Sequence, residues 1–293
     1  MTQLITQVVS EAPSGARAIQ QLSATVGVSR ATFYRQRKRA AQPAVSREHD
    51  AELRQELHRI ALRTSYGYRP MTLELRRRGL LANHKRVLRL MREESLLWRP
   101  RRGFVATTNS EHSFPVYPNL ARNLVPTAIN QLWVADITYI RLPNEFVYLA
   151  VILDAFSRRV IGWALERHLM TTLTLQALQM ALATRQPQAG LVHHSDRGVQ
   201  YASVDYVSLL IKHQIRISMS RTGNPYDNAK AERFMRTLKY EEVYLSDYQN
   251  LVEARASIRR FLEVVYNRLR LHSALGYRPP VEFEQQFFQP ILA

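Results

Sequence analysis

Three acidic residues, Asp136, Asp196 and Glu232, occupy positions where carboxylate chemistry is possible. Asp136 interrupts the apolar run LWVADI, where a charge is unfavourable unless it is paired or binds a metal. The alternative for Asp136 is an ion pair with Arg or Lys. Asp196 follows the apolar run LVHH, at the kind of strand end where α/β sheets bind ligands. Its alternative is a turn cap before Gly198.

The third acid lies in the segment SMSRTGNPYDNAKAERFMRTLKY, residues 218–240. Ala231, Met235 and Leu238 recur there at helical spacing, and Glu232 lies on the polar stripe beside them. Asp227 comes directly after an Asn-Pro-Tyr turn, where an Asp side chain caps a helix. Five positions correspond to about 140° around a helix, so the two acids are unsuited to one ion. We therefore predict that Glu232 is a ligand and that Asp227 is a cap.

The surrounding pattern predicts the elements that position these acids. Apolar β-rich runs at residues 132–141, 146–153 and 159–165 predict an antiparallel meander of three strands. Helices and strands then alternate, and this order is typical of an α/β fold with a mixed sheet and flanking helices. The expected helices are 171–184, 204–213, the one that carries Glu232, and 251–267, and the expected strands are 191–194 and 216–219.

One acid on a central strand, one at the end of a neighbouring strand and one on a helix beside the sheet can meet at a single point. Three carboxylates in a chain without cysteine form a hard-oxygen site, which suits Mg²⁺ or Mn²⁺. Two such ions about 4 Å apart can activate a hydroxyl on one side of a phosphodiester and stabilise the leaving oxygen on the other.

Charge indicates the partner. The chain has 293 residues and a formal charge of +17, and residues 1–128 hold 22 Lys and Arg against 9 Asp and Glu. This surplus predicts an N-terminal region that binds a polyanion. Residues 16–39 fit a helix-turn-helix with Gly27 in the turn and a second helix that presents Arg30, Arg35 and Arg37. An ordinary helical hairpin is the alternative.

A second helical unit contains NHKRVLRLMREE, whose outer face would carry Lys85, Arg86 and Arg89. The expected domains are a helix-turn-helix-like unit at 1–45, a second DNA-binding unit at 46–102, a linker at 103–128, a catalytic core at 129–245, and a C-terminal helix and tail at 246–293. We find no secretory signal and no apolar run of membrane-spanning length, and the absence of cysteine suits a reducing cytosol.

The motifs WVADITYI, HSDRGVQY, SMSRTGNPYDNAKAERF and YNRLRLHSALGYRPP occur in this order. With them the chain, from Tyr66 onward, resembles the OrfB-type transposases of bacterial insertion sequences, in the retroviral-integrase superfamily. The resemblance implies a ribonuclease-H-like core, a catalytic Asp-Asp-Glu triad at Asp136, Asp196 and Glu232, and two-metal strand cleavage and transfer. Lys239, seven positions after Glu232 and so on the same helix face, matches the basic residue of the family and would hold a DNA phosphate.

The resemblance also implies partners: DNA as element ends and target, and a homodimer or larger synaptic complex at the bacterial nucleoid. The chain departs from its relatives in two ways, since it lacks the Cys residues of the retroviral zinc domain and shows no sustained heptads. An OrfA-type partner protein could therefore be required. The rival functions are a DNA-binding regulator without catalysis and a hydrolytic nuclease without joining activity.

Three other sites carry polar residues of suitable type. Asp154 is expected to pair with Arg158 or Arg159, and His193 and His194 are expected to pack or to orient neighbouring groups. Tyr266, Asn267, Arg270 and His272 could contact DNA or hold the last helix to the core, and the sequence leaves both open.

Overall fold

The structure is a computed structural model that describes residues 45–97, 114–221 and 228–288, together with Thr25, Gly27, Ser29, Ala31 and Tyr34. The chain divides into two units, residues 1–58 and 59–293. Among the helices described, none has the length and apolar character needed to span a membrane.

The few described residues of the N-terminal segment agree with the predicted helix-turn-helix. Thr25, Ala31 and Tyr34 are helical, and Gly27 lies in a turn with φ of +68°, a conformation that suits glycine. Arg30, Arg35 and Arg37 lie outside the described residues. Helix α4 spans Val45–Ala61. The sequence AAQPAVSREH, residues 40–49, is typical of a linker, and that interpretation is wrong from Val45 onward, where the chain is helical.

Two further helices, α5 (Tyr68–Arg77) and α6 (His84–Glu93), pack against each other. They bury their apolar residues Met71, Leu75, Val87, Leu90 and Met91. The Asn83 side chain caps α6 by accepting a hydrogen bond from the Lys85 backbone N–H at 2.9 Å. The sequence SYGYRP, residues 65–70, suggests a turn, but the helix already begins at Tyr68, because Pro70 fits the first turn of a helix, where no backbone N–H is needed.

The core of the molecule is a five-stranded sheet with the strand order β3-β2-β1-β4-β5. Its strands are β1 (Leu132–Arg141), β2 (Phe146–Asp154), β3 (Val160–Glu166), β4 (Val192–Ser195) and β5 (Arg216–Met219). The first three form the predicted antiparallel meander, while β4 and β5 join parallel to β1. Thus β1 lies at the centre of a mixed sheet.

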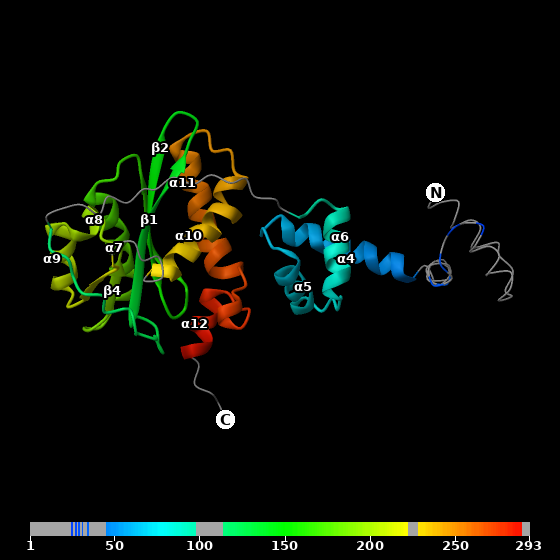
Figure 1. Cartoon of the computed structure of the whole chain (residues 1–293), viewed down its shortest axis with the longest axis horizontal. Helices are drawn as coiled ribbons and strands as arrows, with labels where there is room; N and C mark the ends of the chain where they lie inside the picture. The colour runs from blue at the N-terminus through cyan, green and yellow to red at the C-terminus, as the bar shows by residue number, and fades with distance from the viewer. Residues whose placement is uncertain are drawn as a thin grey trace, which may run out of the picture. The chain divides into compact units, whose positions relative to one another are not determined.

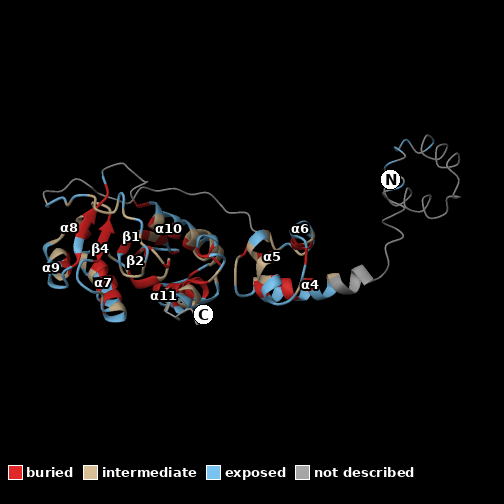
Figure 2. Ribbon diagram, turned by 90° about the horizontal axis from the view of Figure 1, so that it is seen from below, coloured by how far each residue is buried: buried red, intermediate tan, exposed pale blue. Residues whose placement is uncertain are grey.

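Helices cover both faces of this sheet (Figure 1). On one face lie α7 (Thr171–Arg185), α8 (Val199–Ala202) and α9 (Val204–Lys212), and on the other lie α10 (Ala229–Glu241) and α11 (Leu251–Arg260). Each face buries its own hydrophobic cluster, and Figure 2 shows the buried residues gathered along the strands and the inner sides of these helices. A Cβ atom at Gly162 would lie 2.1 Å from the Ala177 carbonyl oxygen, so glycine permits the close approach of α7 to β3.

The C-terminal part is more regular than the sequence suggests. The helix predicted at 251–267 continues beyond α11 as a π-helical segment, Phe261–Leu269. The segment expected to be a tail forms a further helix, α12 (Pro280–Phe288). Pro280 occupies its first position, where proline is favoured, so a residue that suggested a loop marks a helix start. Two short 3₁₀ turns, Val243–Leu245 and Ser273–Leu275, complete the described elements of this part.

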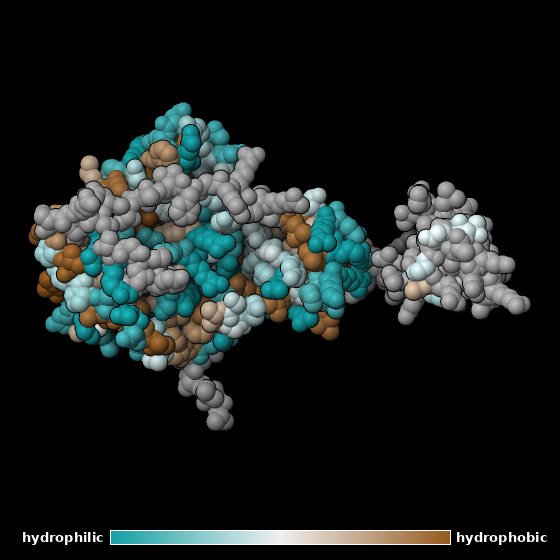
Figure 3. Space-filling model, in the orientation of Figure 1, coloured by the Kyte–Doolittle hydropathy of each residue, from teal (hydrophilic) through white to brown (hydrophobic). Residues whose placement is uncertain are grey.

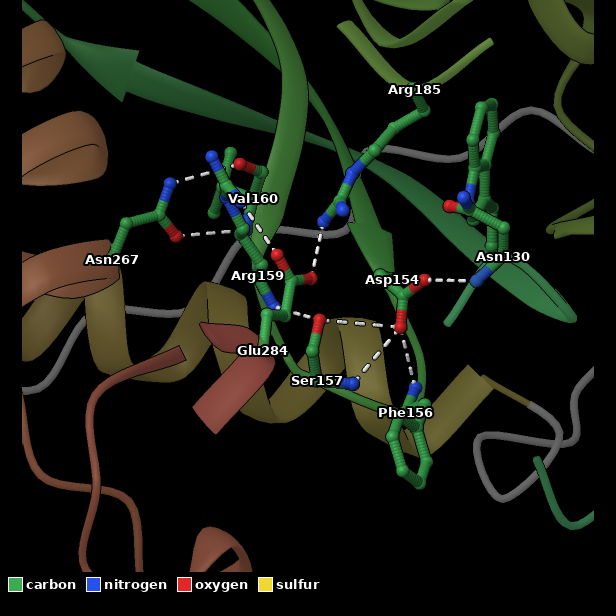
Figure 4. A network of polar contacts seen from close by, with 10 residues as sticks. Asn130, Asp154, Phe156, Ser157, Arg159, Val160, Arg185, Asn267 and Glu284 are labelled. Atoms are coloured by element: carbon green, nitrogen blue, oxygen red, sulfur yellow. Dashed lines mark hydrogen bonds and ion pairs between the residues drawn. The ribbon is translucent and has the colours of Figure 1, made fainter. Parts of the chain in front are cut away.

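A buried polar network ties these C-terminal helices to the sheet (Figure 4). Glu284 of α12 pairs with Arg185 of α7 and with Arg159, the latter at 2.6 Å. The Asn267 side chain binds the Val160 backbone twice: its Oδ1 accepts from the N–H and its Nδ2 donates to the C=O, each at 2.9 Å. Both ion pairs and both amide contacts join segments about a hundred positions apart in the chain.

Asp154 serves the turn after β2. Its carboxylate accepts hydrogen bonds from the backbone N–H groups of Asn130 at 2.7 Å and of Phe156 and Ser157 at 2.9 Å each. The predicted ion pair of Asp154 with Arg158 or Arg159 is wrong, because backbone donors take both carboxylate oxygens and Arg159 turns to Glu284.

We predict that Glu284→Gln lowers the free energy of unfolding by about 3 kcal/mol, because it leaves Arg185 buried without a counter-charge. The two side chains are only 7% and 4% exposed. Urea denaturation would measure the loss. As a matched control, Glu145→Gln breaks an exposed pair with Arg167 and should cost less than about 1 kcal/mol. Equal losses in the two variants would contradict this account.

Candidate active site

The register between β1 and β4 brings Asp136 and Asp196 together. Leu132 pairs with Val192 and Val134 with His194, an offset of sixty positions. The same offset sets Asp196, the residue directly after β4, level with Asp136 on a neighbouring strand. Adjacent strands lie about 4.8 Å apart, and residues two positions apart share a face. Both carboxylates therefore project from the sheet face that α10 covers, because Val134 belongs to the hydrophobic cluster on that face.

Asp136 is a half-buried carboxyl with few stabilising contacts. Its Oδ1 accepts a hydrogen bond from the Ile137 backbone N–H at 2.9 Å, and among the described residues it has no ion-pair partner. Burial and the charge of Asp196 raise the pKa of Asp136 from 3.8 to about 8, and Glu232 adds to this rise. The Ile137 N–H and the Lys239 ammonium oppose it. The alternative of a direct salt bridge for Asp136 thus does not hold within the described part of the chain.

Asp196 is fixed by the turn that follows it. Its Oδ1 accepts a hydrogen bond from the Gly198 backbone N–H at 2.9 Å, so the expected turn cap does exist. A Cβ atom at Gly198 would lie 3.0 Å from this oxygen, closer than a side chain fits without a shift. The cap orients the Asp196 carboxylate, and its charge still reaches Asp136.

Glu232 is presented by α10, whose apolar stripe packs on the sheet as the sequence predicts. Ala231, Phe234, Met235 and Leu238 are buried, whereas Glu232 is exposed in the first turn of the helix. Partial burial of the carboxyl group raises the pKa of Glu232.

Asn228, which sequence reasoning did not single out as functional, fastens the start of α10 to the strand that carries Asp136. Its side-chain amide donates to the carbonyl oxygen of Ala135 at 3.0 Å, and the residue is only 6% exposed. Asn228 and Glu232 are one helical turn apart, so this bond sets where Glu232 lies along β1. In the sequence, the position of Asn228 four residues before Glu232, on the same face of the helix, is the signal that could have identified it.

The predicted cap of α10 remains a prediction. The helix begins at Ala229, with Asn228 at the N-cap position, one residue later than expected. Asp227 lies outside the described residues.

Lys239 lies beside the carboxylates, two turns along α10 from Glu232. Its ammonium nitrogen is 4.5 Å from the centre of the Tyr139 ring. Burial lowers the pKa of Lys239, and the negative charge of Asp136 opposes that shift. A cation thus stands within electrostatic reach of the acid pair.

The donor set suits a hard divalent cation, because it consists of carboxylates whose mutual repulsion such an ion would relieve. In the described part of the chain, however, no three His, Asp or Glu side chains stand close enough to form a ready-made metal site. Asp136 and Asp196 are aligned by the sheet, whereas the exposed Glu232 carboxylate does not close a group of three with them.

The histidines beside Asp196 pack in the interior, as the sequence predicts. The Nε2 atom of His193 is 3.0 Å from the Tyr206 hydroxyl, and burial lowers the pKa of His193 to about 3. His194 bonds to the hydroxyls of Ser218 at 2.8 Å and of Ser220 at 3.0 Å. Both rings hold β4 to its neighbours.

The C-terminal polar group is engaged within the fold. Tyr266, Asn267 and His272 are buried, and Arg270 makes two hydrogen bonds of 2.7 Å each to the Glu241 carboxylate. Of the two roles that the sequence left open, these contacts favour holding the last helices to the core.

The second helical unit presents basic residues on α6. Lys85 and Arg89 are exposed and Arg86 is half-buried, and Arg89 pairs with Glu93 at 2.9 Å. The predicted outward face of this helix is therefore present in the structure.

A five-stranded mixed sheet with two aligned carboxylates at its centre and helices on both faces defines a ribonuclease-H-like α/β fold of the integrase type. The integrase core domain family matches residues 126–225, a second integrase core domain family matches 213–280, and an HTH-like domain matches 47–104.

Relatives that match over most of their length identify the family more narrowly than the domain models do. The chain is 40% identical to the insertion element IS600 uncharacterized 31 kDa protein of Shigella sonnei, over 90% of this chain and 97% of that one. It is 38% identical to transposase InsF for insertion sequence IS3A of Escherichia coli, over 75% and 77%. A chain of the simian T-cell lymphotropic virus intasome shares 21% identity over 76% and 72%, with a TM-score of 0.46.

The chain belongs to the insertion-sequence transposases of the retroviral-integrase superfamily. The enzymes of this class are DNA polynucleotidyl transferases.

We predict that Asp136→Asn stabilises the metal-free protein at alkaline pH. Because the pKa of Asp136 is raised by folding, the folded chain holds this proton more tightly than the unfolded chain between about pH 4 and pH 8. Stability should therefore fall as pH rises through that window. The Asn variant lacks this fall. Its free energy of unfolding at pH 8 should therefore exceed that of the wild type by on the order of 1 kcal/mol or more. Urea denaturation across pH would measure it.

The matched control is Asp154→Asn, which should destabilise at every pH. Its amide NH₂ would face a backbone N–H that now donates to the carboxylate. An Asp136→Asn variant less stable than wild type at pH 8 would refute the account that burial and Asp196 destabilise the ionised Asp136 carboxylate.

Proposed function

We propose that this transposase cleaves and joins DNA strands in reactions that require Mg²⁺ or Mn²⁺, with Asp136, Asp196 and Glu232 as the metal-binding triad. One observation carries the proposal: the raised pKa of Asp136, to which both other carboxylates contribute. Three acids from two adjacent strands and a helix, two of which act on the half-buried third, suit a site that a divalent ion completes.

When bound, two such ions would activate the attacking oxygen and stabilise the leaving oxygen of the phosphodiester. The surrounding residues of the chain hold the three carboxylates in position. Asp136 is held by β1 and Asp196 by its turn cap, so these two carboxylates need little reordering before they bind. Glu232 approaches from α10, which Asn228 fastens to β1.

Lys239 would hold the phosphate of the DNA strand that enters the site. Its ammonium lies over the Tyr139 ring and interacts electrostatically with Asp136, so a phosphate bound near the acids would gain a counter-charge. Water would serve as the nucleophile in donor cleavage, and a DNA 3′-hydroxyl would serve in joining. Both are in-line displacements at phosphorus, so one site suffices for both steps.

The helical units would bring DNA to this site. Lys85, Arg86 and Arg89 on α6 would contact duplex phosphates, with Arg30, Arg35 and Arg37 of the N-terminal segment as further contacts. Two element ends must be joined in one event, which requires a dimer or larger synaptic assembly. An OrfA-type protein could contribute to it, and the work would take place at the nucleoid of the bacterial cytoplasm.

We predict that Asp136→Asn, Asp196→Asn and Glu232→Gln each reduce strand cleavage by at least about 100-fold in Mg²⁺ or Mn²⁺. The measurement is cleavage of a plasmid that carries the inverted repeats flanking the coding region. Circular dichroism should show that the variants remain folded. Wild-type turnover in excess chelator would disprove the metal requirement.

Assays of cleavage and joining by the wild-type protein test the rival functions. A DNA-binding regulator would show no metal-dependent cleavage in the wild type. A hydrolytic nuclease would cleave but would not join a pre-cut 3′ end to a target plasmid, whereas we expect joined product.

We predict that replacing Lys85, Arg86 and Arg89 together by Gln weakens duplex binding and makes it less sensitive to salt. For every phosphate that the variant no longer neutralises, the slope of log K against log salt should become shallower by about 0.9. If all three side chains bind phosphates, the slope would change by about 2.7, which fluorescence anisotropy would resolve. A slope equal to that of the wild type would remove α6 from the DNA interface.

A further inference from the structure

The turn before α5 joins the α5–α6 pair to the catalytic core, where two distant motifs meet: SYGYRP, residues 65–70, and YNRLRLHSALGYRPP, residues 266–280. We infer that Tyr66 of this joint is a positioning residue for strand cleavage. It fixes the α5–α6 pair to the helix that carries Glu232, so that duplex DNA on α6 reaches the active site in one register. The inference rests on the proposed function, since it concerns where that reaction cuts the DNA.

Tyr66 occupies the centre of the joint. Its hydroxyl donates a hydrogen bond to the Leu269 carbonyl oxygen at 2.8 Å and accepts one from the Leu271 backbone N–H at 2.9 Å. The residue is only 6% exposed, and burial raises the pKa of its hydroxyl, which therefore keeps the proton that it donates. Leu269 ends the π-helical segment, and the last carbonyl groups of a helix lack partners within it. Tyr66 thus closes this helix end, which a phenylalanine could not do.

The residue before Tyr66 closes the end of the catalytic helix. The Ser65 hydroxyl donates to the carbonyl oxygen of Glu241, the last residue of α10, at 3.2 Å. Arg270, which stands between the two residues that Tyr66 binds, makes two hydrogen bonds of 2.7 Å each to the Glu241 carboxylate. The joint therefore ties the turn before α5 to the ends of both α10 and the π-helical segment.

Helix α10 connects this joint to the active site. Glu232 and Glu241 lie nine positions apart on it, which corresponds to about 14 Å. Between them, the Phe234 ring meets the Tyr266 ring edge to face, with the ring centres 4.8 Å apart. The π-helical segment thus contacts α10 near Glu232 as well as at its end, so the joint and the active site share one supported helix.

A second attachment lies at the other end of α5. Arg77, the last residue of this helix, pairs with Glu282 of α12 at 2.6 Å and donates to the Tyr277 carbonyl oxygen at 3.2 Å. A helix of ten residues is about 15 Å long. Two attachments this far apart fix the direction of α5 as well as its position, and α6 packs on α5. The basic residues of α6 are therefore held at a set distance from Glu232.

The contacts of the joint are directional and polar. On the face seen in Figure 3, hydrophilic residues cover most of the described surface and hydrophobic patches are small and scattered. Hydrogen bonds require particular distances and angles, so a joint made of them specifies one arrangement. An α5–α6 pair that was merely tethered by the chain between α6 and β1 would instead offer DNA to the active site in many registers.

The first test measures the joint in EDTA, without catalysis. Because the chain has no cysteine, Leu81→Cys and Val252→Cys provide two specific sites for spin labels, both exposed and outside the joint. The distribution of distances between the labels should be narrow in an otherwise wild-type chain. Adding Tyr66→Phe should broaden it about twofold, because two buried backbone groups then lose their partner.

The second test maps the cut. In Mg²⁺ the wild type should cleave a labelled duplex that carries the inverted repeat at one phosphodiester. Tyr66→Phe should bind this duplex as tightly as the wild type in EDTA, since the basic face of α6 is unchanged. It should nevertheless cut about tenfold less at the wild-type position and add cuts at neighbouring positions, because misplaced reactants react slowly. A loss of stability alone would reduce the product without moving the cut.

Tyr248→Phe is the matched control, because Tyr248 is 5% exposed and its hydroxyl donates to Glu242 within the core at 2.8 Å. It should keep the narrow distribution and the single cut. Arg77→Gln, which breaks an exposed pair and leaves the buried hydrogen bonds intact, should broaden the distribution as Tyr66→Phe does.

A broad distribution in the wild type, or one in Tyr66→Phe that is as narrow as in the wild type, would overturn the joint. A broad distribution with an unchanged cut would overturn the positioning role. A wild type that fails to cleave would refute the proposed function instead, and the distances measured in EDTA would still decide whether the joint exists.

Discussion

The active site of this protein depends on two carboxylates that adjacent strands of one sheet hold side by side. Asp136 and Asp196 come level because β1 and β4 pair in parallel with a fixed offset. Burying one such group is unfavourable and burying two near each other is more so, which the raised pKa of Asp136 records. The rest of the core must therefore supply enough stability to keep both in place.

That stability comes from contacts outside the acid pair. Two hydrophobic clusters, one on each face, hold the strands in register. The network around Glu284 and Asp154 holds the C-terminal helices and the turn after β2. In this arrangement the acid pair and its supports are separate, so the site keeps an acid whose ionised form is destabilised by burial and by Asp196.

Much of this fold could be predicted from sequence because its patterns are local. The strand meander, the apolar stripe of α10 and the isolated acid in β1 are each visible within a dozen residues. The polar contacts were harder, since they join distant segments. Nothing near Asp154 shows that Arg159 pairs with Glu284, 125 positions later. Likewise the bond from Asn228 to Ala135 spans 93 positions, and only the register of the fold reveals it.

The open edge of the sheet has a consequence for assembly. β3 is an outer strand, and outer strands offer backbone groups to which another chain can add. Here the Asn267 amide takes both groups of Val160, and the Arg255 guanidinium takes the Leu165 carbonyl near the other end. These side chains occupy backbone groups of β3 that an added strand would need. A strand added along this edge would have to displace them, so sheet-to-sheet association through β3 is disfavoured.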